Sequence, residues 1–270
     1  MTLVLTYVSR DYDVMVGDTR LCIPDPKTGK LIPFNEDAIK FAHTRGLLFG
    51  FAGVAGFSRI PTTDWLRRKF EKSDLDLEAG LAALAQELDA RFQRGDVKGM
   101  PLIVTIAGWV LNESDDSLTP VVATVTNQDP HTFKIMTSFK HEWSVHPADA
   151  GWVATGQISP ERRAQVQQDL EKVLHPFVKP DVIANVFLRA LRGEAAENVT
   201  VGERARVATL PLSVLTLARE QDDDHFIVWR VREPILVDGQ PTEVELEPDQ
   251  TAVGLVRVEH VDFSQAYIID

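Results

Sequence analysis

Three residues near the start of the chain have the types needed for attack on a carbonyl group by a terminal amino acid: Thr2, Asp18 and Lys40. If Met1 is removed, as we expect before a small residue, Thr2 carries both a hydroxyl and a free α-amine. A hydroxyl is a poor nucleophile until a base takes its proton, and an α-amine with an ordinary pKa of about 7.7–8.0 can do so. That amine needs an acid to orient it and a cation to lower its pKa. Asp18 is the candidate acid, and Lys40 is the candidate cation.

The segments that carry these residues have the pattern of an antiparallel sheet. Strands are expected at 3–8, 14–16, 38–42 and 47–52. In a hairpin the end of the second strand lies beside the start of the first, so Asp18 can reach Thr2 across the ladder. Lys40 falls in the third of these strands. The intervening residues 22–35, CIPDPKTGKLIPFN, contain three prolines and are expected to form an extended loop.

The joint spacing of Thr2, VGDTR, DAIKF and FGFAGVAG resembles the catalytic half of proteasome β-type subunits, including the bacterial HslV peptidase and the Anbu group. The resemblance covers roughly the first sixty residues. It implies that Thr2 is the nucleophile of an N-terminal nucleophile hydrolase and that Asp18 fixes Lys40, which tunes the threonine. Arg20 belongs to the acid-x-arginine turn of that family. The backbone N–H of Gly53 would form the oxyanion hole.

The second half of the chain departs from this family pattern. Ala154-Thr155-Gly156 stands where the family has Gly-Ser-Gly, so Thr155 would keep the hydroxyl. The best match to a family aspartate and serine is the segment 198–202, in which Asn198 replaces the acid and Val201 replaces the serine. A neutral amide cannot orient an ammonium as a carboxylate does. The alternative is therefore a catalytically inactive protein of the same fold, with a structural or binding role in a homo-oligomer.

Each candidate residue also has an ordinary structural interpretation. Thr2 is a common type of strand residue. Asp18 and Arg20 could form a turn salt bridge of little energetic weight, and Lys40 could face solvent on an edge strand. Gly53 could simply end a strand. It is the joint spacing of these residues that favours the catalytic interpretation.

The rest of the sequence predicts two pairs of helices separated by strands. Helices are expected at 63–71, from 77 to about 94, after the Ser159-Pro160 cap, and at 180–191. Further strands are expected at 102–110, 119–127, 133–139, 151–156, 207–215 and 225–231, with a hairpin at 234–246. This order predicts an α+β fold, a four-layer αββα sandwich of two antiparallel sheets flanked by helices. We expect one domain over 1–233 and a C-terminal β-rich extension, 234–270, packed on it.

Composition disfavours several other classes of protein. With 44% hydrophobic and 25% charged residues, the 270-residue chain has the profile of a globular protein, and its net charge of −12 disfavours nucleic acid as a partner. No apolar run reaches the ~20 residues needed to span a membrane, and no signal peptide is evident, so we expect a cytoplasmic protein. One cysteine, Cys22, cannot form an internal disulfide.

Neither a metal nor a cofactor is expected, because the seven histidines are dispersed without ligand spacing. The expected partners are a peptide or small amide substrate and, by the resemblance, further copies of the chain in a homo-oligomer. Nothing in the sequence identifies an unfolding ATPase.

Overall fold

The computed structural model describes residues 2–44, 46–57, 60–71, 76–94, 97–112, 117–129, 134–145, 150–174 and 178–212, with four short strands between 229 and 262. These parts of the chain contain four helices, α1 (Thr62–Phe70), α2 (Leu77–Phe92), α3 (Pro160–Val173) and α4 (Pro180–Glu197). None of the described helices has the length and apolar character needed to cross a bilayer.

Most strands belong to two large sheets. The first has the order β12-β1-β2-β13-β17, with bounds Gly151–Gly156, Leu3–Val8, Tyr12–Asp18, Arg204–Pro211 and Arg257–Asp262. The second has the order β11-β10-β9-β6-β5, with bounds Ile135–Val145, Ser117–Gln128, Leu102–Asn112, Leu47–Gly53 and Phe41–Thr44. All these neighbours are antiparallel, whereas β14 (Trp229–Val231) pairs with β9 in parallel. The predicted α+β class with antiparallel sheets is therefore confirmed.

Three smaller pairs complete the strands that the structure describes. They are β3 with β4 (Leu21–Pro24 and Leu31–Asn35), β7 with β8 (Gly56–Phe57 and Ile60–Pro61), and β15 with β16 (Leu236–Val237 and Gln240–Pro241).

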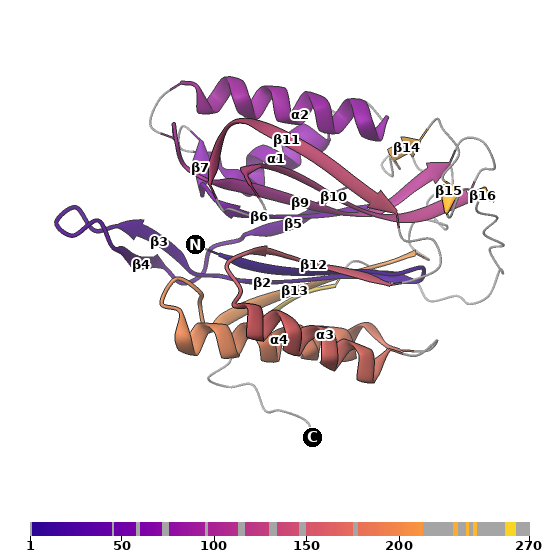
Figure 1. The fold of residues 1–270 in the computed structure, drawn as a ribbon. Helices are drawn as coiled ribbons and strands as arrows, with labels where there is room; N and C mark the ends of the chain where they lie inside the picture. The colour runs from indigo at the N-terminus through magenta and orange to yellow at the C-terminus, as the bar shows by residue number, and fades with distance from the viewer. Residues whose placement is uncertain are drawn as a thin grey trace.

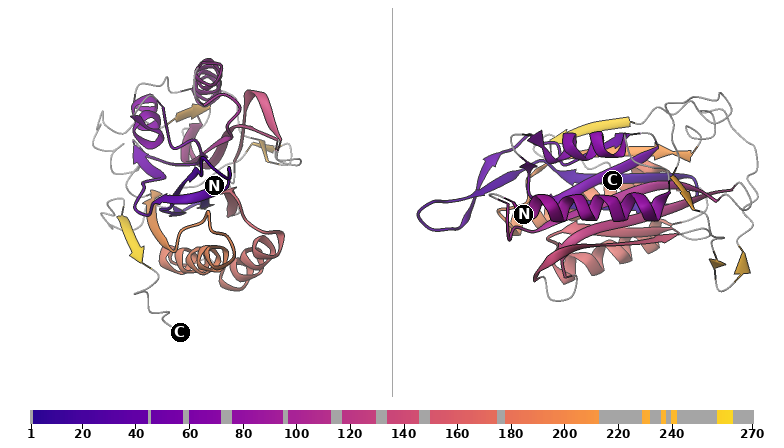
Figure 2. Two further views of the ribbon diagram at one scale, coloured as in Figure 1. Left: turned by 90° about the vertical axis from the view of Figure 1, so that its left-hand side faces the viewer. Right: turned by 90° about the horizontal axis from the view of Figure 1, so that it is seen from above.

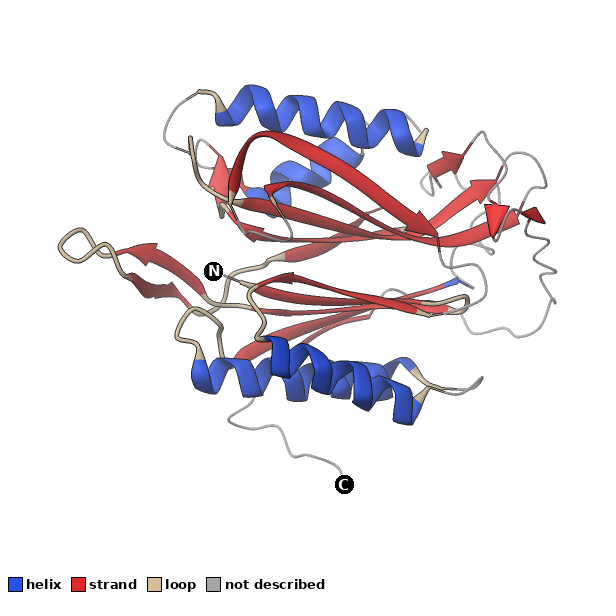
Figure 3. Cartoon of the chain, viewed as in Figure 1, coloured by secondary structure: helices blue, strands red, loops and turns tan. Residues whose placement is uncertain are grey.

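The helices cover the outer faces of the two large sheets, which face one another across a shared interior (Figure 1 and Figure 3). Helices α1 and α2 lie over the second sheet, and α3 and α4 lie over the first, an arrangement that the two turned views also show (Figure 2). Alternation along β1 and β2 explains this layering. Leu5 and Val16 pack toward α3 and α4, whereas Val4 and Met15 pack between the sheets against Phe41.

Local signals set the helix starts as predicted. The Ser159 side chain accepts a hydrogen bond from the Arg162 amide at 3.3 Å, and Pro160 occupies the first helical position. Asp76 caps α2 in the same way, accepting from the Ala79 amide at 2.9 Å.

The structure corrects three predictions of secondary structure. Residues 22–35 are not an extended loop, because most of them form the β3–β4 hairpin, which projects from the body as an arm (Figure 1). Its prolines are tolerated because a two-stranded ribbon has free edges on both sides. Lys40 is not within a strand but immediately precedes β5. Helix α4 continues to Glu197, beyond the predicted end at residue 191.

The C-terminal part of the chain is described only in short strands. Strand β17 pairs with β13 and so extends the first sheet. The predicted hairpin at 234–246 is represented by the β15–β16 pair, and its Asp-Gly turn lies outside the described residues.

Candidate functional site

Asp18, the last residue of β2, gathers four hydrogen-bond donors from separate parts of the chain. One carboxylate oxygen accepts the backbone N–H of Leu3 at 2.7 Å. The other accepts the Lys40 ammonium at 2.7 Å, the Arg20 amide at 3.0 Å and the Gly202 amide at 3.1 Å. The Asp18 side chain is fully buried. It thus fixes the start of β1, the residue before β5 and the segment before β13 around one carboxylate.

Lys40 is also fully buried, so the interpretation of it as a solvent-facing residue is wrong. Its carbonyl accepts the Phe51 amide at 3.0 Å, which fixes this residue against β6. Desolvation lowers the pKa of Lys40 below its ordinary value, and the opposing effect of the Asp18 carboxylate is smaller. The site therefore contains a lysine that loses its proton more readily than a lysine in water.

Thr2 lies next to this ion pair and is 3% exposed. Its carbonyl accepts the Gln157 amide at 3.2 Å. Gly156 has a φ of +102°, and a Cβ built there would lie 1.7 Å from the Thr2 carbonyl oxygen and 3.1 Å from the Ala52 Cβ. Three segments thus meet closely here: the chain start, the end of β12 and the end of β6.

Gly53 follows Ala52 at the end of β6 and also requires glycine. Its φ is +116°, and a Cβ there would lie 2.0 Å from the carbonyl oxygen of Pro101. The next amide, that of Val54, donates to the same oxygen at 3.2 Å. The backbone therefore turns sharply at Gly53, the residue whose amide the resemblance assigns to the oxyanion hole.

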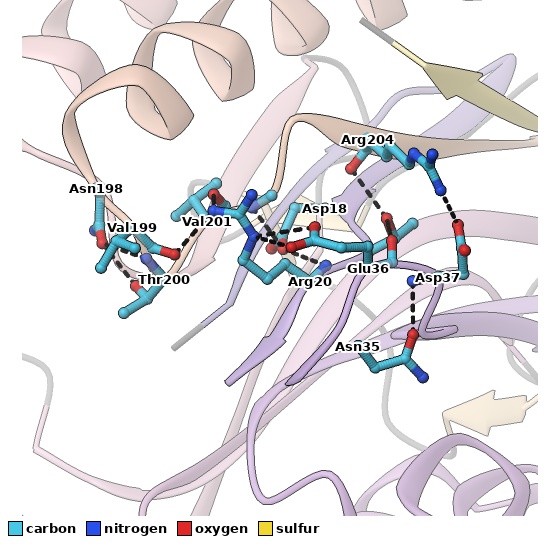
Figure 4. Close-up of polar contacts among 12 residues, drawn as sticks. Asp18, Arg20, Asn35, Glu36, Asp37, Asn198, Val199, Thr200, Val201 and Arg204 are labelled. Carbon is cyan, nitrogen blue, oxygen red and sulfur yellow. Dashed lines mark hydrogen bonds and ion pairs between the residues drawn. The ribbon is translucent and has the colours of Figure 1, made fainter. Parts of the chain in front are cut away.

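Arg20 does not form a turn salt bridge with Asp18. Its guanidinium pairs with Glu36 at 2.9 Å and donates to the carbonyls of Val199 and Val201 at 2.9 and 3.1 Å (Figure 4). Only its backbone amide reaches Asp18. Arg20 therefore has a structural role: its side chain connects the base of the β3–β4 arm to the segment after α4.

Asn198 and Val201 lie near this network, but their side chains do not enter it. The side-chain oxygen Oδ1 of Asn198 accepts the Thr200 amide at 3.0 Å and the Thr200 hydroxyl at 2.7 Å, which closes a turn after α4 (Figure 4). Val201 is fully buried in the core against α3 and α4. Gly202 supplies the contact to Asp18 through its backbone.

Thr155 lies opposite Val4 in the β1–β12 pair, and its hydroxyl contacts the Thr105 hydroxyl of the other sheet. Both threonines are buried. The hydroxyl that the sequence assigned to the site thus links the two sheets directly.

Sequence reasoning missed Glu36, Thr105 and the amide of Gly202. Glu36 follows the proline-rich segment, and its approach to Arg20 depends on the hairpin, which the sequence analysis did not predict. Thr105 looks like any threonine in an apolar strand. The Gly202 amide has no side-chain signal at all.

Among the residues that the structure describes, no group of three or more His, Cys, Asp or Glu side chains is placed to hold a metal ion. Neither a scan against protein-family models nor a search of curated proteins found a match to this chain. The site is therefore interpreted from its own geometry: a buried aspartate–lysine pair beside the second residue of the chain and a sharply turned glycine segment.

Proposed function

We propose that, once Met1 is removed, this chain is an N-terminal nucleophile hydrolase of the proteasome β type, with a four-layer αββα fold. It would cleave an amide bond through an acyl-enzyme on Thr2. The observation that carries the proposal is the buried Asp18–Lys40 pair, which shares its carboxylate with the amide of the residue after Thr2. The layered arrangement of helices and sheets supports it.

In the proposed reaction, the Thr2 hydroxyl oxygen forms a bond to the substrate carbonyl carbon, and its proton passes to the α-amine. A neutral Lys40 is the second possible acceptor, and its lowered pKa increases the neutral fraction at a given pH. Asp18 orients Lys40 and the chain start. The amide of Gly53 would stabilise the negative charge on the substrate oxygen.

The carbon–nitrogen bond of the amide then breaks, and the departing amine takes the transferred proton. Water attacks the resulting ester, gives its proton to the same base, and releases the acid together with the Thr2 hydroxyl. The substrate would be a peptide or a small amide. We further propose that the protein is cytoplasmic and homo-oligomeric, as the family resemblance implies.

A catalytically inactive protein of this fold is the second candidate, and one observation favours it. The side-chain oxygen of Asn198 is occupied by Thr200, and Val201 offers no hydroxyl, so neither of these two side chains is placed to orient an amine. In that case the Asp18 network would serve stability alone.

Intact mass and covalent labelling separate the two candidates. Mass spectrometry of the purified protein tests whether Met1 is lost. A peptide with an electrophilic epoxyketone is then added, because this group can bond to both the hydroxyl and the amine of a terminal threonine. We expect one label on the wild type, one on Thr2→Ser, and none on Thr2→Ala. Retained Met1, or equal labelling of Thr2→Ala, would refute the hydrolase proposal.

A further inference from the structure

A cavity of about 440 Å³ lies at the C-terminal end of α2, beside strand β7. Figure 1 shows β7 near one end of α2, at the end of the molecule where the N-terminus lies. Phe57, Ala90 and Val97 supply apolar walls, whereas Glu87, Arg91 and Arg94 supply charge. None of the residues assigned above to the reaction lines it.

The Arg91 guanidinium is held in place by aromatic rings. Its central carbon lies 5.7 Å from the centre of the Phe57 ring and 4.9 Å from that of Trp65. Glu87 is engaged mainly by Lys69, at 2.7 Å, and lies 3.7 Å from the Arg91 Nε. That Nε is buried and has no hydrogen-bond acceptor among the described residues. The Arg91 charge thus lies against two aromatic rings and, among the described residues, is paired with the Glu87 carboxylate at 3.7 Å.

Arg94 lies just beyond the end of α2 and also lines the cavity. In the part of the chain that the structure describes, its guanidinium has no ion-pair or hydrogen-bond partner. Glu87 is already paired with Lys69, so Arg91 and Arg94 are the cations of the described lining that can pair with an anion. A carboxylate attached to an apolar group matches both a guanidinium fork and the apolar walls of this lining.

We propose that this cavity binds a monoanionic carboxylate that is attached to an apolar group. The planar guanidinium of Arg94 would donate to both carboxylate oxygens, as arginine does with this group. Arg91 would supply the second positive charge, and the tail would pack on the apolar walls. The site is independent of the hydrolase proposal, since it uses none of the same side chains.

The test is titration calorimetry at low ionic strength on full-length Thr2→Ala protein, which removes any turnover from the signal. The probe is N-acetyl-leucine, and its uncharged amide, N-acetyl-leucinamide, is the matched control ligand. We expect binding of the acid, and at least about tenfold weaker binding of the amide. Arg94→Gln should weaken binding of the acid by about tenfold, and Arg94→Lys by less, because lysine keeps the charge but loses the planar fork.

Arg68→Gln is the control variant, because Arg68 is an exposed cation on α1 outside the cavity lining. It should change binding of the acid by less than about twofold, which is the scale of a screened surface charge. Equal binding of acid and amide, equal loss in Arg68→Gln and Arg94→Gln, tighter binding of inorganic phosphate, or no binding at tens of millimolar would each overturn the proposal. Thermal melting of every variant checks that a loss of binding is not a loss of folding.

Discussion

Removing one partner of the Asp18–Lys40 pair should destabilise the protein in a way that depends on which partner is removed. Lys40→Met keeps an apolar stem of similar length and leaves the Asp18 carboxylate with its three backbone amides. Asp18→Asn keeps the shape but leaves a buried ammonium without its counter-charge. It also turns an amide NH₂ group toward a ring of N–H donors.

Both side chains are fully buried and 2.7 Å apart, so solvent screening does not reduce these effects. Breaking a buried pair costs about 3–5 kcal/mol in the free energy of unfolding, which is a large part of the stability of a typical domain. We expect Lys40→Met near about 3 kcal/mol, because the three amides still stabilise the carboxylate. Asp18→Asn should be nearer about 5 kcal/mol at pH 7. The double variant should lose less than the sum of the two single losses.

The two variants should also respond differently to pH. Burial already lowers the pKa of Lys40 in the folded protein, and loss of Asp18 removes the main opposing effect. Between the lowered pKa of Lys40 in the folded Asp18→Asn variant and the unfolded value of about 10.4, the unfolded chain binds a proton that the folded variant does not. The stability of Asp18→Asn, relative to the wild type, should therefore rise with pH through this window. Lys40→Met has no such proton to lose.

Urea denaturation of both single variants, the double variant and the wild type at pH 7, 8 and 9 measures these differences. The reasoning is refuted if either single loss is below about 1 kcal/mol, the scale of an exposed ion pair. It also fails if the loss in Asp18→Asn does not change with pH, since that would mean the ammonium is solvated.

Three further predictions concern other parts of the fold. Burial raises the pKa of Asp13 well above its ordinary value, so the folded state keeps a proton that the unfolded chain loses above about pH 3.9. Asp13→Asn should therefore gain stability over the wild type as pH rises from 4 to 7, by at most about 1.4 kcal/mol per pH unit. Urea titrations measure this gain, and a difference that stays constant with pH would contradict it. Gly53→Ala should lose at least about 3 kcal/mol or fail to fold, whereas Gly29→Ala, with a φ of +68° and nothing within 4 Å of the new Cβ, should lose only about 1 kcal/mol by the same assay. Thr155→Val should cost about 1–3 kcal/mol in thermal melts by leaving the Thr105 hydroxyl unpaired, and adding Thr105→Val should recover most of that loss.

Local signals in the sequence were enough to predict most helices and strands. Each of them has its own spacing of hydrophobic residues, and the helices also have recognisable capping residues. The stripe of leucines in α2 and the Ser159-Pro160 start of α3 are examples, and both helices begin where predicted. Two apolar runs, at 3–8 and 14–16, also predicted β1 and β2, and therefore the position of Asp18 beside the chain start. The Asp18–Lys40 contact itself was inferred from a family resemblance. The spacing of hydrophobic residues predicts strands and helices, but it does not predict a contact between two polar residues 22 positions apart.

The sequence failed where a contact depends on the backbone or on a partner distant in the chain. Prolines suggested a loop at 22–35, but the Arg20–Glu36 ion pair at its base and the pairing of Ile23 with Ile32 give a hairpin. The sequence suggested that Asn198 replaces a catalytic acid, yet its side-chain oxygen closes a local turn. A short polar side chain next to a helix end commonly bonds to its own neighbours, and only coordinates show which choice is made.

The contacts of Asp18 and Lys40 stabilise the fold, and the same residues are proposed to act in the reaction. Loss of activity in an Asp18 or Lys40 variant would therefore not by itself identify a catalytic residue. Thr2 separates the two, because its hydroxyl makes no hydrogen bond with any residue that the structure describes. Thr2→Ala should therefore change the free energy of unfolding by less than about 1 kcal/mol, while abolishing labelling by the epoxyketone peptide. A large loss of stability in this variant would mean that the hydroxyl is a structural group, and it would favour the inactive member of the fold.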